Sequence, residues 1–392
     1  MSHGTYREDS VAQVVTSSVP VDGHIDDKIF RQLRVIWQET LGIESVGFDQ
    51  NYFDLGGDSS LAVQMFARIE NIFRIKLPLA TLYEAPTLDE LAKVLRCEAS
   101  VSRWSPLVEI QPNGSRPPFF CIHPHGGNVL VYRELANQLG PDQPFFGLQS
   151  RGLDGSEEPL STIEEMAELY LKEVRTVQPH GPYFLGGYCM GGAVAYEMAC
   201  QLKASGEEIA LLALFDTMEL SSFLPPSFLQ MSYYNCQRLF FHVWNLFALN
   251  SRDRSRFVSE KLSSLRVRIP VWFAKRSRKK TAADATSFSQ AEVLDRVWQA
   301  NFRAYLAYTA KPFAGVVTDI CPSRQYRLLD SPSLKWEHVA LGGRKKVILP
   351  VNPPAILADP FVGHLSRALK QCIDDAIQSS VPSTSPLESV RA

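Results

Sequence analysis

The sequence predicts a small helical unit followed by a larger α/β unit with a mostly parallel sheet. Residues 25–96 place apolar side chains at helical spacing, whereas short apolar strands alternate with helices from Phe119 onward. Such alternation is typical of a parallel sheet with helices on both faces. A Gly-rich turn at residues 186–192 joins a strand to the next helix, which predicts a nucleophile elbow, the sharp turn that presents a reactive side chain.

The helical unit is expected to span residues 23–97. Before it, residues 1–22 have the composition of a flexible leader, and after it residues 98–117 have the Ser, Pro and Gly content of a linker. Helices are predicted from three groups of apolar residues at helical spacing, namely Ile29, Leu33, Ile36, Trp37 and Leu41, then Leu61, Val63, Met65, Ile69 and Phe73, then Leu88, Leu91, Val94 and Leu95.

The α/β unit is expected to span residues 118–376, and the Ser- and Pro-rich tail, residues 377–392, is predicted to be disordered. Strands are predicted at residues 119–122, 145–148, 183–185, 209–215, 316–320 and 347–349, and helices near residues 129–139, 162–177, 193–204 and 361–376. Residues from about 218 to 300 interrupt the alternation with helical, aromatic and basic sequence, which indicates a lid over the ligand end of the sheet. We interpret its basic residues as a solvated helix face.

Bulk properties exclude several classes of function. The chain has 392 residues, enough for two or three domains, and its formal charge of −2 gives no reason to expect binding to nucleic acid or to a membrane surface. No apolar run is long enough to span a bilayer, and residues 1–22 lack the hydrophobic stretch of a secretory signal. Seven scattered cysteines without a CxxC pair indicate reduced thiols in a cytoplasmic protein and no metal site.

The elbow sequence, Gly186-Gly-Tyr-Cys-Met-Gly-Gly192, has Cys189 where a serine usually stands. Glycines are needed because the strand reverses into a helix with little room around the nucleophile. A thiol at a helix N-terminus is expected to have a lowered pKa, which favours the thiolate. The competing interpretation is a buried structural cysteine after a Gly-rich turn.

Residues 52–62, Tyr-Phe-Asp-Leu-Gly-Gly-Asp-Ser-Ser-Leu-Ala, resemble the phosphopantetheine attachment motif of acyl and peptidyl carrier domains. The resemblance implies a four-helix bundle with 4'-phosphopantetheine bound covalently to Ser59. The glycine pair allows the loop to expose the hydroxyl, and a helix starting at Asp58-Ser59 presents its positive end to a phosphodiester. The alternative is that these two residues only cap the helix.

Residues 119–376 are similar to the type I thioesterase domains that end nonribosomal peptide and polyketide assembly lines, which have the α/β-hydrolase fold. The similar stretches are residues 120–128, 178–183, the elbow and residues 211–217. A carrier directly before such a domain is the usual end of an assembly line. The resemblance therefore implies upstream modules, a phosphopantetheinyl transferase and an acyl or peptidyl substrate as partners.

The resemblance also assigns roles by position. Cys189 is the implied nucleophile, and Asp216, which closes the next strand, is the implied acid. The backbone N–H groups of Met190 and His125 are the implied oxyanion hole. The alternative for Asp216 is an aspartate at a strand end that caps the lid.

The base of this family has no counterpart in the chain. The family pattern after the last strand aligns with residues 347–360 without a gap, and Pro353 falls where the histidine should be. His125 is the leading substitute because it lies beside the expected oxyanion hole. Other candidates are His123, His338, His364 and His242, whereas His180 is expected to be structural.

Two functions of different class follow. In the first, an acyl chain moves from the arm on Ser59 to Cys189 and leaves by hydrolysis, cyclisation or transfer to an amine. A thiol depends less on a base than a serine does, so attack by water suffers most from the loss at Pro353. In the second, a degenerate hydrolase fold only binds or shelters the carrier-bound chain. A free-standing esterase or lipase is a third reading, but it leaves the carrier unexplained.

Overall fold

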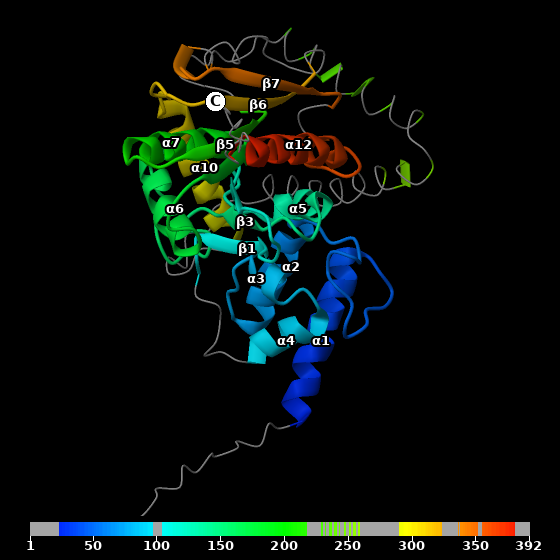
Figure 1. The fold of residues 1–392 in the computed structure, drawn as a ribbon. Helices are drawn as coiled ribbons and strands as arrows, with labels where there is room; N and C mark the ends of the chain where they lie inside the picture. Colours follow the sequence, from blue (N-terminus) through cyan, green and yellow to red (C-terminus); the bar gives the residue numbers. More distant parts are fainter. Residues whose placement is uncertain are drawn as a thin grey trace, which may run out of the picture.

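The computed structural model describes residues 23–96, 104–217, 290–323, 338–351 and 355–380, together with Trp336 and scattered positions between 229 and 258. The predicted leader, most of the predicted lid, His242, Pro353 and the end of the tail lie outside the described residues. Figure 1 shows the helical unit, in blue to cyan, against one side of the α/β unit. None of the helices within the described ranges is long and apolar enough to cross a membrane.

The helical unit is a four-helix bundle, as predicted. Its helices are α1 (Gly23–Leu41), α2 (Ser59–Phe73), α3 (Thr81–Glu84) and α4 (Leu88–Arg96). They enclose one apolar core, in which Trp37 meets the ring of Tyr52 edge-on at 5.5 Å between centroids. Helix α3 was not predicted, because four residues are too short to show helical periodicity.

Within its described residues, the α/β unit contains a seven-stranded sheet with the order β1-β3-β2-β4-β5-β6-β7. Every neighbouring pair is parallel except β1 with β3, which confirms the predicted mostly parallel sheet. The strands are β1 (Leu107–Gln111), β2 (Phe119–Ile122), β3 (Phe145–Leu148), β4 (Tyr183–Tyr188), β5 (Ile209–Phe215), β6 (Val317–Pro322) and β7 (Arg344–Leu349).

Strand β1 corrects the predicted linker, which covered residues 98–117. Residues 107–111 form an antiparallel edge strand on β3 instead. Only Val108 is buried in this strand, and its pairing is irregular between Glu109 and Gln111. An edge strand with one buried side chain gives too weak an apolar pattern to stand out beside the Pro-Asn-Gly that follows it.

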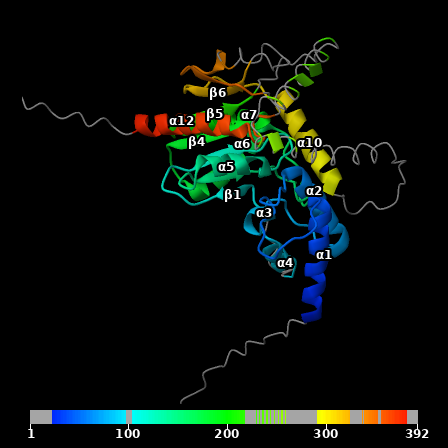
Figure 2. The ribbon, with the colours of Figure 1, turned by 90° about the vertical axis from the view of Figure 1, so that its right-hand side faces the viewer.

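Helices cover both faces of the sheet, in agreement with the prediction (Figures 1 and 2). Helices α6 (Ile163–Val177) and α7 (Met190–Ala204) share one apolar core with residues of and just after α10 (Gln290–Ala307). The 3-10 helix η2 (Leu130–Tyr132), α5 (Arg133–Leu139) and α12 (Val362–Ser380) lie on the other face. Because α12 ends at Ser380, the first residues of the predicted disordered tail are helical.

Helix α7 lies unusually close to the end of β2. A Cβ atom on Gly191 would stand 2.2 Å from the Ile122 carbonyl oxygen and 2.6 Å from that of His123. Both neighbours are backbone atoms of a central strand and its loop, so they cannot move aside as a flexible side chain would. The start of α7 therefore requires glycine at this position.

Gly191→Ala is expected to destabilise the α/β unit by about 1–3 kcal/mol or more, because the added methyl overlaps fixed backbone. Thermal unfolding monitored by circular dichroism measures the change. Gly363→Ala in the first turn of α12 is the matched control, since its new Cβ would meet only the end of the Gln138 side chain at 3.2 Å. Equal stability of the Gly191 variant and the wild type would contradict this account.

Candidate functional site

The turn between β4 and α7 has the strained backbone of a nucleophile elbow. Cys189 has φ 56° and ψ −122°, a left-handed conformation that side chains rarely adopt and that costs about 1–3 kcal/mol. Its N–H donates to the carbonyl of Phe215 at 2.9 Å, which ties the turn to the end of β5. A Cβ on Gly187 would stand 2.3 Å from the Gly191 carbonyl carbon, so the turn closes only around glycines. Strain held by such contacts is typical of a reactive site.

His125 lies directly against the thiol. The distance from Cys189 Sγ to His125 Nδ1 is 3.3 Å, within hydrogen-bonding range for sulfur. The other ring nitrogen, Nε2, is buried and has no hydrogen-bond partner among the described residues. Aromatic rings of α10 enclose the imidazole, and their centroids lie 6.2 Å (Trp298), 5.7 Å (Phe302) and 5.2 Å (Tyr305) from its own.

The loop that carries His125 is held by a residue that sequence reasoning missed. Asn301 of α10 is fully buried, and its Nδ2 donates to the His125 carbonyl at 3.0 Å. Ser150 Oγ donates to the Asn301 Oδ1 at 3.4 Å. The only signal in the sequence was a polar residue within the apolar stripe of a helix, just beyond the predicted lid.

Burial sets the protonation state of the pair. The pKa of the Cys189 thiol is raised to about 12, chiefly by burial and in smaller part by the negative charge of Asp216, while a hydrogen bond from the Met190 N–H acts in the opposite direction. Burial lowers the pKa of His125 to about 4. The expectation of a lowered thiol pKa was therefore wrong, because desolvation outweighs the helix N-terminus. The resting pair is a neutral thiol and a neutral imidazole.

Asp216 lies just after β5, next to the elbow. It also has a left-handed backbone, with φ 43°, and its N–H donates to the Ile320 carbonyl at 2.9 Å. Its effect on the thiol pKa places its carboxylate within electrostatic range of Cys189. The structure thus places His125 and the first N–H of α7 against Cys189, with Asp216 acting on the thiol electrostatically, and the catalytic roles expected for these residues stay predictions.

Two other candidate bases have structural partners. His123 is fully buried, its Nε2 lies 2.7 Å from the Tyr170 hydroxyl, and its Nδ1 lies 2.7 Å from the Pro124 carbonyl. His364 Nδ1 lies 3.2 Å from Arg367 Nη2 on the surface of α12.

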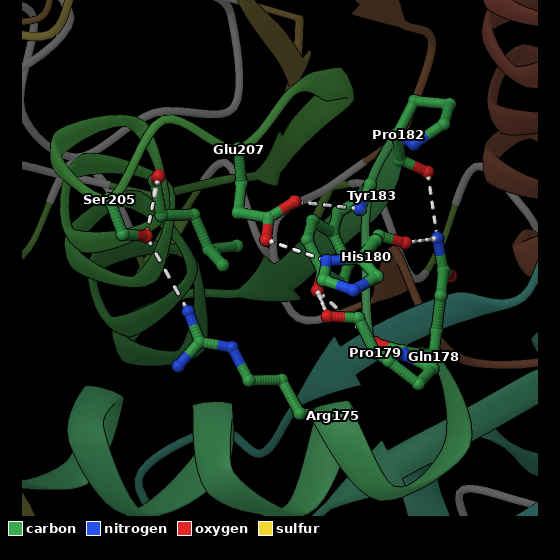
Figure 3. Close-up of polar contacts among 10 residues, drawn as sticks. Arg175, Gln178, Pro179, His180, Pro182, Tyr183, Ser205 and Glu207 are labelled. Carbon is green, nitrogen blue, oxygen red and sulfur yellow. Dashed lines mark hydrogen bonds and ion pairs between the residues drawn. The ribbon is translucent and has the colours of Figure 1, made fainter.

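His338 and His180 are the remaining candidates within the described residues. His338 is exposed. Figure 3 shows His180 near the amino end of β4, where its Nδ1 lies 3.3 Å from Glu207 Oε1. Cys189 follows the opposite end of that strand, so the structural role expected for His180 is consistent with its position.

The carrier loop fits a phosphopantetheine attachment site. A Cβ on Gly57 would stand 2.4 Å from the ring of Tyr52, and Gly56 has φ 89°, so both positions need glycine. Asp58 Oδ1 accepts from the Leu61 N–H at 2.8 Å and caps α2, so the cap does not depend on Ser59. Ser59 is partly exposed in the first turn of α2, where the helix end favours a phosphate.

Tyr132 connects the His125 loop to the elbow. Its buried hydroxyl donates to the Ile122 carbonyl at 2.6 Å and accepts from the Tyr188 N–H at 3.1 Å. Because Tyr188 directly precedes Cys189, this hydroxyl sets the spacing between the two walls of the site.

Known proteins share both halves of this architecture. Residues 31–95 match the family model of the phosphopantetheine attachment site, and residues 117–224 match that of the thioesterase domain. The chain contains a phosphopantetheine carrier domain followed by a thioesterase domain of α/β-hydrolase fold. It is homologous to the terminal modules of nonribosomal peptide synthetases, and its carrier domain implies a phosphopantetheine bound covalently to a serine.

The curated relatives that this chain matches are much longer than the chain itself. A dimodular nonribosomal peptide synthase of Bacillus subtilis is 43% identical over 190 residues, which are 48% of this chain and 8% of that protein. Malpinin synthetase of Mortierella alpina is 45% identical over 184 residues, 46% of this chain and 2% of that protein. The crystal structure of a four-domain nonribosomal peptide synthetase bound to AMP and glycine aligns with 93% of this chain over 27% of its own length, at 25% identity and a TM-score of 0.54.

The pKa values predict how Cys189 reacts with pH. Because its thiol pKa is about 12, the thiolate fraction and the alkylation rate should rise about tenfold per pH unit between pH 6 and 9, without a plateau. Mass spectrometry of the Cys189 peptide after timed iodoacetamide treatment measures this rate, with the exposed Cys236 as internal reference. A rate independent of pH over this range would instead indicate a preformed thiolate–imidazolium pair.

Tyr132→Phe leaves the Tyr188 N–H and the Ile122 carbonyl without their partner, at an expected loss of about 1–3 kcal/mol of stability. Tyr183→Phe is the matched control, since it removes hydrogen bonds to the Gln178 and Pro179 carbonyls near the opposite end of β4 (Figure 3). We expect both variants to unfold at lower temperature, but only Tyr132→Phe to slow acylation of Cys189 by a small thioester. If acylation of Cys189 slows equally in both variants, Tyr132 has no specific role in positioning the thiol.

Proposed function

We propose that this chain is the release unit of a nonribosomal peptide or polyketide assembly line and that an acyl chain passes from an arm on Ser59 to Cys189. The observation that carries the proposal is the 3.3 Å contact between Cys189 Sγ and His125 Nδ1 in a strained elbow. The boundaries 23–97 for the carrier and 118–376 for the thioesterase belong to the same proposal. So do upstream modules, a phosphopantetheinyl transferase, an acyl or peptidyl substrate and a cytoplasmic location.

His125 is the proposed base in place of the histidine lost at Pro353. The phosphopantetheine group, when bound, supplies a thiol that carries the acyl chain as a thioester. His125 Nδ1 accepts the Cys189 proton while the sulfur attacks the thioester carbonyl, and the first N–H of α7 and that of His125 stabilise the oxyanion. His125 would then return the proton to the arm sulfur as the bond between that sulfur and the carbonyl breaks.

The pKa values explain why proton transfer has to accompany attack. A thiol of pKa about 12 beside an imidazole of pKa about 4 does not ionise at rest, so the proton moves only as the new carbon–sulfur bond forms. Exchange of one thioester for another is nearly balanced in energy. Activation of water needs a stronger base, so release to an amine or to a nucleophile within the chain is favoured over fast hydrolysis.

Loading Ser59 with hexanoyl-phosphopantetheine and following intact mass tests the proposal. We expect the hexanoyl group to reach Cys189 in the wild type, to stay on the arm in Cys189→Ala, and to be absent from Ser59→Ala. His125→Ala should slow the transfer by about 10²-fold or more, the usual contribution of a general base. His180→Ala is the matched control, because this histidine lies at the opposite end of β4.

A degenerate binding domain is the second candidate. The high thiol pKa favours it, as does the Nε2 of His125, which has no hydrogen-bond partner within the described part of the chain. This second candidate predicts that the acyl group stays on Ser59 equally long in the wild type and in Cys189→Ala, with several chain types and with added amines. That result would overturn the enzymatic proposal.

A further inference from the structure

The segment that carries the proposed base also contacts the carrier. Residues 129–133, termed here the docking segment, begin four residues after His125 and include η2 and the start of α5. Val129 accepts a hydrogen bond from the Tyr83 hydroxyl of the carrier at 3.3 Å. Leu130 is 5% exposed and belongs to the apolar core of the carrier helices. A thioesterase side chain thus completes the carrier core.

Arg133 adds recognition of a particular carrier sequence. Its guanidinium lies 4.1 Å from the centroid of the Phe53 ring, and its Nη2 lies 3.5 Å from Asp54 Oδ1. The arginine side chain is 24% exposed, so its contact with the Phe53 ring is partly shielded from water. Asp54 is 74% exposed, so the ion pair is open to solvent and adds little. Phe53 and Asp54 directly precede the loop whose glycine pair leads to Ser59. Arg133 therefore contacts the carrier just before the proposed attachment site.

We infer that the docking segment is the surface by which the thioesterase recognises its carrier. Arg133 selects carriers that present an aromatic residue followed by an acidic one ahead of the glycine pair. This inference rests on the proposed function, because it assigns a partner to the same site. Arg133 is a positioning residue that contacts no reacting atom. It holds the attachment loop while the rest of the segment connects to His125 and, through Tyr132, to the elbow.

The contact between α2 and α10 supports a specific arrangement of the two domains. Helix α10 touches α2 of the carrier and also encloses His125 with its aromatic rings. Figures 1 and 2 both show α2 on the side of the bundle that faces the thioesterase. The base is thus flanked by two elements that each contact the carrier, the docking segment and α10.

The test compares two reactions of Cys189 in the full chain. One is transfer of hexanoyl from the arm on Ser59, and the other is acylation by the soluble thioester hexanoyl-N-acetylcysteamine. Arg133→Gln should lower the ratio of the first rate to the second by about 5- to 30-fold, the range expected when a partly shielded cation–π contact is lost together with an exposed ion pair. Arg133→Lys should give a smaller loss, because lysine keeps the charge but not the planar stacking group.

Two further variants separate recognition from general destabilisation. Arg68→Gln removes an exposed ion pair to Glu39 within the carrier and should leave the ratio unchanged. The double variant Phe53→Leu, Arg133→Gln should lower the ratio by less than the product of the two single effects, because both substitutions remove the same contact between Arg133 and the Phe53 ring. A ratio unchanged in Arg133→Gln, or lowered equally in Arg68→Gln, overturns the inference.

If the wild type transfers no acyl group, that result refutes the proposed function but not the inference about docking. Amide hydrogen exchange then tests the inference separately. The peptide covering residues 129–133 should be protected in the wild type and in Arg68→Gln. In Arg133→Gln and Phe53→Leu it should exchange faster, because the carrier then leaves the surface more often. Equal exchange in all four proteins overturns the inference without reference to chemistry.

Discussion

Close approach of α7 to the carboxyl ends of β2 and β4 is the constraint on which the site depends. The missing side chains of Gly187 and Gly191 allow this approach, and the backbone of Cys189 takes up the resulting strain. The Tyr132 hydroxyl then joins the end of β2 to the residue before the thiol. The position of the Cys189 thiol is therefore set by backbone contacts at the ends of these strands.

The same close packing partly desolvates the thiol and the imidazole, and this desolvation shifts both of their pKa values toward the neutral forms. Both groups become neutral at rest, although a helix N-terminus alone would favour a thiolate. Aromatic rings from α10 extend the dry surroundings around His125. Under the proposed function, such surroundings would protect an acyl group on Cys189 from stray water.

Much of this organisation could be predicted from the sequence. Strands such as Phe119–Ile122 and Ile209–Phe215 are short, fully apolar runs that stand out in the sequence. The glycines of the elbow and of the carrier loop were also predictable, because sharp turns with little room require glycine. Asn301 could not be found, since it reaches the site only through the packing of a helix distant in sequence. The thiol pKa was also missed, because local sequence shows the helix end but not the depth of burial that opposes it.

The shared segment between His125 and Arg133 bears on how such chains can be recombined. A junction placed in residues 98–117 separates the two domains in sequence, yet Leu130 stays behind as part of the carrier core. A foreign carrier joined there meets a thioesterase whose surface was shaped for another partner. Chimeras of this chain are therefore expected to need carrier-matched residues at Leu130 and Arg133, while Tyr132 between them stays with the thioesterase, so the functional boundary runs through the thioesterase fold.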